Sequence, residues 1–377
     1  MTSDRAGDGP LMEAEELRFR SHNGDVVLAK ATFGPDEPLA PPFLAARPAR
    51  LADGTEFRQL RVTGTPRKLG YERLDNEILA GLRLHEMSES VGYPPEVSRL
   101  LGYEATSADP FVLLEPYRGE SLTEAAQYLL EAEQHLFQVS LLTGLCWLVA
   151  AGIAHRGIAP STIRWDGRRA QITDLSMSTV LGAPREAIGT PPWAAREQRP
   201  GHATGAASAQ DDIWATGRLI FYVYTREELI SRSQIDEWPA MRSLLAGVFS
   251  PPEDRPTARV MLSRLNAECP VPRALDDHSR LDAGRRRFYA VRASKHPGMA
   301  TEADAGDGDG PGGSEGVPRE SSDQVSAQAN AGTSPTGDTT GEPRSGRRLL
   351  RRFSPLSSLI TGGLAVLRAA IVTSVVR

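Results

Sequence analysis

Apolar runs separated by turn signals extend from about Leu17 to Leu265, and this pattern limits where the chain can bury a core. From about Ala293 to Gly346 the sequence turns to Gly, Ser, Thr, Asp, Glu and Pro. Such a segment cannot bury enough apolar surface to offset the entropy lost on ordering, so we predict a disordered linker there. The final segment, residues 347–377, is basic and apolar. The fold must therefore be built by the part of the chain that precedes the linker.

Net charge and cysteine usage narrow the function classes. The formal net charge is −5, which argues against nucleic-acid binding through a basic surface. Cys146 and Cys269 lack metal-site and redox spacing, so we expect a reduced, cytoplasmic environment. The N-terminus lacks the basic start and apolar core of a signal peptide. The frequent Ala, Arg, Gly and Pro suggest a bacterial source.

Secondary-structure signals change from strands to helices along the folded part. Short β-type runs lie in GDVVLAKATF and EFRQLRVTG, close to Asn-Gly and Asp-Gly turns. The stretch GYERLDNEILAGLRLHEM predicts a helix with Leu74, Ile78, Leu82 and His85 on one face and Glu77 beside them. EQHLFQVSLLTGLCWLVAAGI and DDIWATGRLIFYVYT predict buried helices, and polar residues within the first argue against a membrane span. This order predicts an α+β arrangement.

Six short stretches occur in an order that is typical of one enzyme superfamily. In chain order they are FVLLEPYRGESL, AHRGIAPSTIRW, ITDLS, GTPPWAAREQ, AQDDIWATGRLIFYVYT and PPEDRPTARVML. They resemble the hinge, catalytic loop, metal-binding D-F-G, end of the activation segment, anchoring helix and closing helix of the eukaryotic-type protein kinases, which include bacterial Ser/Thr kinases. One such motif alone is a weak signal, but six in order are specific. The resemblance runs from about Pro41 to Leu265 and implies a two-lobed fold with a small β-rich N-lobe and a larger helical C-lobe.

The catalytic loop of this family follows the pattern H-R-D-x-K-P-x-N, and three of its chemical side chains are replaced here. Gly157 stands where the resemblance implies the Asp that accepts the substrate proton. Ala159 replaces the Lys that steadies the transferring phosphate, and Thr162 replaces the Asn that holds a second metal ion. Phosphoryl transfer depends on positioning and on cations that neutralise developing charge. The loop therefore keeps no intact catalytic residue.

The positions that the resemblance assigns to nucleotide binding are partly replaced as well. Asp174 keeps the acid of D-F-G, which either holds one Mg²⁺ ion or caps a turn. Arg61 takes the place of the strand Lys and either pairs with Glu77 or is a plain surface residue. The Gly-rich phosphate loop is missing, and a Pro-rich stretch offers fewer backbone donors in its place. These changes argue against ATP and Mg²⁺ as cofactors, which Arg61, Glu77 and Asp174 would otherwise contact.

The architectural residues of the family are retained. The resemblance implies that Asp212 hydrogen-bonds the catalytic-loop backbone, that His155 and Arg156 hold this loop, and that Glu197 and Arg255 form a buried ion pair. A binding or scaffolding descendant of a kinase would keep this set. Three hydroxyls in the presumed activation segment are either phosphate sites that pair with Arg156 or ordinary loop side chains: Ser178, Thr179 and Thr190.

The C-terminal segment combines four arginines with an apolar stretch from Phe353 to Val376. An amphipathic helix on an anionic membrane suits this pattern. A single membrane span is the second interpretation, although Arg368 within it would cost about 3 kcal/mol on insertion scales. A helix that docks on the domain or on a partner is the third. The four arginines are Arg347, Arg348, Arg351 and Arg352.

These observations predict five regions and one principal function. The regions are an N-terminal extension with extra strands (1–40), a kinase-like N-lobe (41–115), a kinase-like C-lobe (116–270), a largely disordered linker (271–346) and a membrane-associating helix (347–377). The function is that of a membrane-tethered pseudokinase that regulates or scaffolds protein partners of a signalling pathway, without binding nucleic acid. A weakly active ATP-dependent Ser/Thr kinase and a pure protein-interaction domain are the alternatives.

Overall fold

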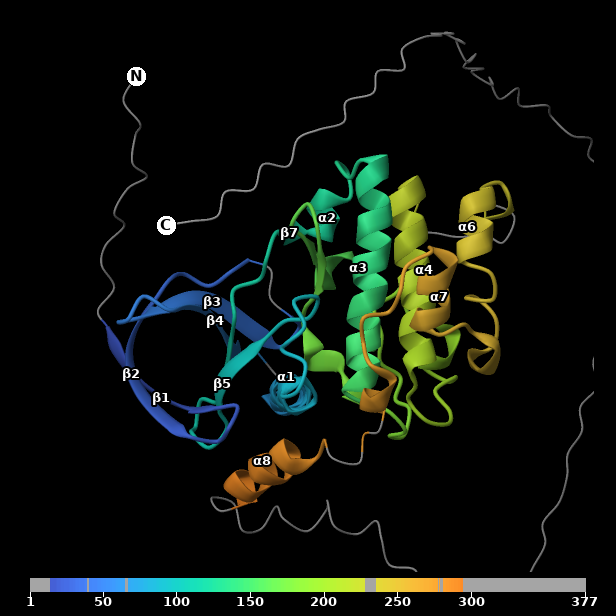
Figure 1. Cartoon of the computed structure of the whole chain (residues 1–377). Coiled ribbons are helices and arrows are strands. Elements are labelled where there is room, and N and C mark those ends of the chain that lie inside the picture. Colours follow the sequence, from blue (N-terminus) through green and yellow to red (C-terminus); the bar gives the residue numbers. More distant parts are fainter. Residues whose placement is uncertain are drawn as a thin grey trace, which may run out of the picture. The chain divides into compact units, whose positions relative to one another are not determined.

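A closed six-stranded β-barrel forms the first part of the molecule. The computed structural model describes residues 14–38, 41–64, 67–227, 235–276, 278 and 281–293. The barrel order is β1-β2-β3-β4-β6-β5 (Figure 1). Its strands are β1 (Glu15–Ser21), β2 (Val26–Phe33), β3 (Leu44–Leu51), β4 (Glu56–Val62), β5 (Leu100–Glu104) and β6 (Phe111–Leu114). All neighbouring strands run antiparallel.

Strand β1 closes the barrel by pairing with β5, where Arg20 lies opposite Tyr103 and Ser21 opposite Gly102. A Cβ atom on Gly102 would lie 2.5 Å from the Phe19 ring, so this position accepts only glycine without a shift. Since β1 and β2 belong to the barrel, the predicted boundary at residue 41 is wrong, and the barrel begins at Glu15.

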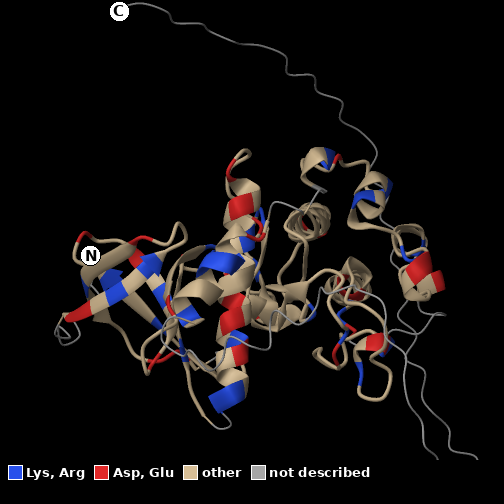
Figure 2. Cartoon of the chain, turned by 90° about the horizontal axis from the view of Figure 1, so that it is seen from below, with Lys and Arg blue, Asp and Glu red and all other residues tan. Residues whose placement is uncertain are grey.

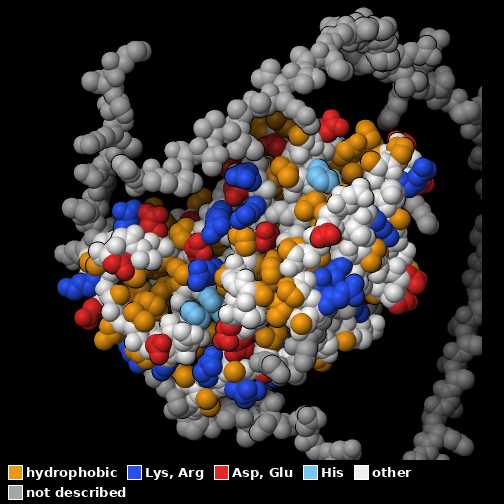
Figure 3. Space-filling view, in the orientation of Figure 1, with side chains coloured by type: hydrophobic (Ala, Val, Ile, Leu, Met, Phe, Trp, Pro, Cys, Tyr) orange, Lys and Arg blue, Asp and Glu red, His pale blue; other side chains and the backbone are white. Residues whose placement is uncertain are grey.

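Side chains of the strands alternate between the barrel interior and an outer face that packs on a helix. The interior contains an apolar cluster made of Leu17, Phe19, Ala31, Phe33, Ala49, Phe57, Phe111 and Leu113. Hydrophobic side chains gather over the barrel in Figure 3, and elsewhere on that face charges of both signs are interspersed. The outer face of β3 to β6 contributes Leu44, Ala46, Leu60, Leu100, Tyr103, Val112 and Leu114 to a second core cluster.

The predicted helix after β4 is confirmed as α1 (Arg67–Ser88). Its predicted inner face, Leu74, Ile78, Leu82 and His85, is buried. The first three side chains pack against the outer face of the barrel. Figure 2 shows charged residues of both signs along α1, which is typical of a helix that also has a solvated side.

A helical part follows the barrel (Figure 1). Its helices are α2 (Leu122–Ala125), α3 (Glu131–Ala150), α4 (Ala209–Thr225), α6 (Pro239–Leu244) and α7 (Ala258–Arg264), with short 3₁₀ turns η1 (Pro160–Thr162), η2 (Leu175–Met177), η3 (Arg196–Gln198), η4 (Pro252–Asp254) and η5 (Arg273–Asp276). The predicted core helix is α3, whose apolar residues share one core with α4 and α7. Among the described residues, no helix combines the length and hydropathy needed to cross a bilayer.

Short strands connect these helices at the side nearest the barrel. They form two small antiparallel sheets, β10-β9-β7 and β11-β8. The strands are β7 (Glu120–Ser121), β8 (Ile153–Ala154), β9 (Ile163–Trp165), β10 (Ala170–Ile172) and β11 (Thr179–Val180). Two of the motifs identified in the sequence lie here, AHRGIAPSTIRW from β8 to β9 and ITDLS from β10 into η2.

A final helix, α8 (Ala283–Ala293), corrects the predicted linker. Residues 283–293 form a helix rather than part of a disordered linker, and Phe288 is fully buried against the barrel and α1. Arg292 also forms an ion pair with Asp75 of α1. Phe288 is preceded by three arginines, so the composition of this stretch did not indicate a buried helix. The remaining predicted linker (294–346) and the predicted membrane-associating helix (347–377) lie outside the described residues.

Candidate functional site

The loop between β8 and η1 carries the predicted catalytic-loop residues and is fixed by one carboxylate. Asp212 of α4 accepts hydrogen bonds from the backbone N–H groups of His155 and Arg156, each at 2.7 Å. The ring of His155 lies 3.0 Å from the carbonyl oxygen of Thr173. Burial raises the pKa of Asp212 to about 7, and the two N–H donors oppose this rise. The loop backbone is thus tied to α4, as the resemblance implied.

The three replaced positions of the loop offer no groups for proton or phosphate transfer. Gly157 has no side chain, and a Cβ atom there would lie 3.1 Å from the sulfur of Met177. Ala159 is buried. The Thr162 hydroxyl accepts from the backbone N–H of Ala159 at 3.0 Å and donates to the carbonyl oxygen of Gly157 at 3.0 Å. This hydroxyl therefore serves the loop's own backbone rather than a ligand.

Glu77 of α1 is a buried acid whose charged neighbours include the partly buried Asp174. Asp174 has a left-handed backbone (φ 62°) and accepts a hydrogen bond from the N–H of Ser176 at 3.3 Å, so it caps η2. Glu77 is 1 % exposed, and neither of its carboxylate oxygens makes a well-formed hydrogen bond with a described residue. Burial, together with the charge of Asp174, raises the pKa of Glu77 to about 8.

The structure places Arg61 on the wrong side of β4 for the predicted pairing with Glu77. Arg61 shares its face with Phe57, inside the barrel, and its guanidinium lies 2.6 Å from the carboxylate of Asp36. Arg58 is three positions earlier and therefore faces the opposite side, where its charge acts on Glu77. Arg58 replaces Arg61 as the basic residue of this site.

A stack of three side chains, which the sequence did not predict, fills the space beside the hinge. Arg58 lies over the ring of Tyr117 at 4.5 Å, and Arg164 lies over the same ring at 5.5 Å. Tyr117 belongs to the stretch that resembles a kinase hinge, and Arg164 to β9. Contacts of this type are worth about 0.5–2 kcal/mol each, depending on desolvation. Arg58 is further held by Glu37, with 2.8 Å between nitrogen and oxygen.

Arg156 links the catalytic loop to the segment that resembles an activation segment. Its guanidinium lies 2.9 Å from the carboxylate of Glu186 and also donates to the carbonyl oxygens of Met177 and Ser178, at 2.7 and 3.3 Å. Of the three candidate phosphate hydroxyls, Ser178 is buried, Thr179 lies in β11 and Thr190 accepts backbone bonds in a turn through its carbonyl. The Glu186 carboxylate, rather than any of these three hydroxyls, pairs with the Arg156 guanidinium.

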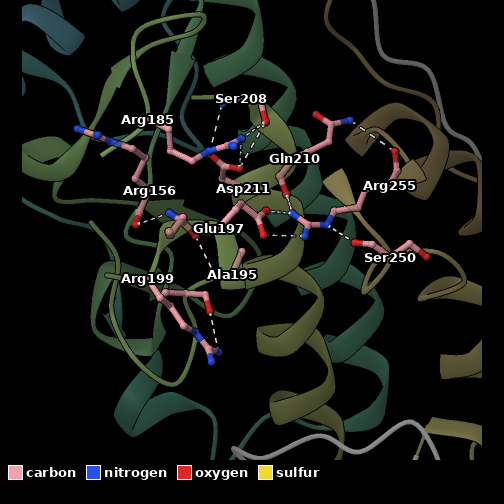
Figure 4. Close-up of polar contacts among 12 residues, drawn as sticks. Arg156, Arg185, Ala195, Glu197, Arg199, Ser208, Gln210, Asp211, Ser250 and Arg255 are labelled. Carbon is pink, nitrogen blue, oxygen red and sulfur yellow. Dashed lines mark hydrogen bonds and ion pairs between the residues drawn. The ribbon is translucent and has the colours of Figure 1, made fainter. Parts of the chain in front are cut away.

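The predicted pair of Glu197 and Arg255 is present as a two-pronged ion pair (Figure 4). The Arg255 side chain is 1 % exposed and also donates to the carbonyl oxygens of Gln210 and Ser250, each at 2.9 Å. Burial acts to raise the pKa of Glu197, but the hydrogen bonds from Arg255 outweigh it and the pKa is lowered. This contact joins η3 to the segments that flank α4 and α7.

Few side chains at this point could contact a magnesium nucleotide. Mg²⁺ requires several oxygen ligands in octahedral geometry. Asp174 and Glu77 are the carboxylates at this point, while Thr162 is occupied by the loop backbone and Arg58 by Glu37. Within the described ranges, no cluster of three or more His, Cys, Asp or Glu residues is placed to hold a metal ion. The protein oxygens free to ligate a metal ion at this point are thus limited to these two carboxylates.

Comparison with known proteins supports a distant relationship to protein kinases. No family model matches the chain. A serine/threonine-protein kinase of Saccharomyces cerevisiae, SSK22, is 26 % identical over 210 residues. The matched region covers 48 % of this chain and 16 % of the yeast protein. The chain is thus kinase-like in sequence over about half its length, and it spans a small part of that relative.

Proposed function

We propose that this protein is a two-lobed, kinase-like protein that no longer transfers phosphate and that regulates or scaffolds protein partners. The barrel with α1 would be the small lobe, and the helical part the large lobe. The observation that carries the proposal is the state of the catalytic loop. Its backbone is fixed by Asp212, yet Gly157 supplies no base and the Thr162 hydroxyl is bound to the loop itself.

The retained contacts support a binding role over a decayed enzyme. Asp212, Arg156 and the pair of Glu197 and Arg255 hold the loop, the activation-like segment and the helices in place. Losing one partner of a buried ion pair leaves an uncompensated buried charge, which destabilises the fold. The presence of both Glu197 and Arg255 therefore indicates that the shape of the domain is maintained. The replaced groups are those that would handle the phosphate.

A phosphoryl-transfer assay tests this proposal directly. Full-length protein is incubated with radiolabelled ATP, Mg²⁺ and a generic protein substrate, and we expect no label on the protein or the substrate. Transfer that Asp174→Ala abolishes would overturn the proposal and establish the weakly active Ser/Thr kinase. Asp53→Ala, at an exposed turn, is the matched control for the substitution.

Nucleotide binding separates the remaining alternatives. A ligand that binds the native state raises the unfolding temperature, so ATP with Mg²⁺ should leave the melting temperature unchanged if the cleft holds no nucleotide.

We further propose that the chain acts in the cytoplasm at a membrane, through the basic and apolar segment 347–377. Full-length protein should sediment with vesicles that contain anionic lipid, and replacing the four flanking arginines with glutamine should release it.

A further inference from the structure

The stack of Arg58, Tyr117 and Arg164 borders a cavity of about 960 Å³ between the barrel and the hinge-like segment. Its volume lies in the range that holds a small organic molecule. Most of its lining is apolar and comes from the ends of β2 and β3, from β4 and from the hinge-like segment: Phe33, Pro35, Pro48, Phe57 and Pro116. The cavity therefore suits a ligand with an apolar body.

The charges around this cavity leave a single positive charge without a carboxylate. Its charged lining consists of three arginines and two glutamates: Arg50, Arg58, Arg164, Glu37 and Glu56. Arg50 pairs with Glu56, and Arg58 pairs with Glu37. Within the described part of the chain, Arg164 has no carboxylate at ion-pair distance. One negative group on a ligand would neutralise this excess.

Donor atoms at the same place also lack partners. Nη1 of Arg58, Nε of Arg164 and the hydroxyl of Tyr117 are buried, and none makes a hydrogen bond with a described residue. The Arg58 side chain is only 7 % exposed. A buried donor without a partner costs about 1–3 kcal/mol, and more when it is charged. Three such donors around one cavity indicate a site that is completed by an acceptor from outside the chain.

We propose that this cavity binds a small amphipathic monoanion, with a flat apolar body against the phenylalanine and proline walls and one carboxylate on Arg164. The proposal rests on the proposed function, because a bound nucleotide would compete for the same space. ATP carries about four negative charges, whereas the cavity offers one unpaired cation and also presents Glu37 and Glu56. A monoanion matches this charge pattern and a nucleotide does not.

Calorimetric titration of the full-length protein with naphthoate tests the proposal. Its uncharged analogue naphthamide should bind at least about tenfold more weakly, because a charge-assisted hydrogen bond is worth about 1.5–3 kcal/mol. Arg164→Gln should weaken naphthoate binding by a similar factor. Arg168→Gln, at an exposed position in the turn after β9, should leave it unchanged. Arg164→Lys keeps the charge and should retain part of the affinity, which guards against a variant that merely unfolds.

Three results would each overturn the monoanion site. The first is that naphthoate fails to bind at about 1 mM. The second is that naphthoate and naphthamide bind equally, and the third is that folded Arg164→Gln binds naphthoate as well as the parent protein. Phosphate transfer in the kinase assay bears on the proposed function instead, so the two failures are distinguishable.

Discussion

The guanidinium of Arg156 lies 2.9 Å from the carboxylate of Glu186, so the activation-like segment carries a built-in negative charge at the arginine of the catalytic loop. The Arg156 side chain is 3 % exposed and Glu186 is 62 % exposed. A phosphorylated hydroxyl would supply the same charge only after modification. The segment is thereby held to the loop without one.

Glu186→Ala should loosen this segment while leaving the fold intact. Because Glu186 is largely exposed, we expect a loss of about 1 kcal/mol in the free energy of unfolding. Amide exchange should become faster across residues 178–188. Glu16→Ala, an exposed residue of β1, is the control and should change neither quantity. Unchanged exchange in Glu186→Ala would show that Arg156 does not hold the segment through this contact.

The buried pair of Glu197 and Arg255 should matter more for stability. Glu197→Gln leaves a cation that is 1 % exposed without its partner, and we expect a loss of about 3 kcal/mol at neutral pH, measured by urea unfolding. The exposed pair of Arg50 and Glu56 is the control, since Glu56→Gln should cost under about 1 kcal/mol. Equal losses would contradict this assignment.

The same pair has a defined pH dependence. The pKa of Glu197 is lowered in the folded protein, so its stabilisation is present above the unfolded value of about 4.5 and is lost as the pH falls through the folded value. The difference in unfolding free energy between the parent protein and Glu197→Gln should therefore shrink in acid. A difference that stayed constant down to about pH 3 would mean that the carboxylate is not held ionised by Arg255.

The sequence predicted much of the helical part, and of its two interpretations of Arg61 the pairing with Glu77 is the one that the structure contradicts. Strand β4 is buried on both faces, by the barrel interior and by α1, so its apolar residues do not alternate cleanly. Pairing an arginine of β4 with Glu77 requires knowing which face of the strand packs on α1. Arg58 and Arg61 are three residues apart, so they lie on opposite faces of the strand. The retained motif residues could be identified because each stands at a set position within a short motif.

Other parts of the site could not be read from local sequence. Tyr117, Arg164 and Glu186 come from three separate segments of the chain. Only the folded backbone brings Tyr117 between Arg58 and Arg164, and Glu186 to Arg156. Closure of the barrel by β1 likewise depends on pairing with β5, which is about 80 residues away along the chain. Strand signals in the N-terminal segment were visible, but their partner was not.

The raised pKa of Glu77 predicts that the folded protein loses stability as the pH rises. Its pKa is raised to about 8 by burial, so between the unfolded value of about 4.5 and pH 8 the folded protein binds a proton that the unfolded chain has released. Stability therefore falls as the pH rises through this window, by on the order of 1 kcal/mol per pH unit, and levels off above it. Glu77→Gln mimics the neutral acid and should remove this contribution.

The test of Glu77 compares urea unfolding of the two proteins from about pH 5 to about pH 9. The two curves should nearly coincide at the acid end, and Glu77→Gln should be the more stable protein at the alkaline end. Other titrating groups, including Asp212, cancel in the difference because they are shared. A variant that is less stable than the parent at every pH would show that Glu77 is ionised and paired in the native state.

Helix α8 ties the end of the described chain to α1, the helix that carries Glu77. Phe288 is fully buried against the barrel and α1, whereas Tyr289, its neighbour, is 41 % exposed. Asn76, on the same helix as Glu77, donates to the carbonyl oxygen of Ser176 at 3.0 Å, so α1 also contacts η2 next to Asp174. Release of α8 should therefore loosen α1 and, through it, η2.

Phe288→Ala should lower the free energy of unfolding by about 3 kcal/mol, because removing a large buried aromatic side chain leaves a cavity in the core. Tyr289→Ala, with similar size and greater exposure, should cost under about 1 kcal/mol. Amide exchange should rise in α1 and in residues 174–177 for Phe288→Ala alone. If exchange rises only within α8, the helix is anchored but does not set the position of α1, and the coupling to Asp174 is wrong.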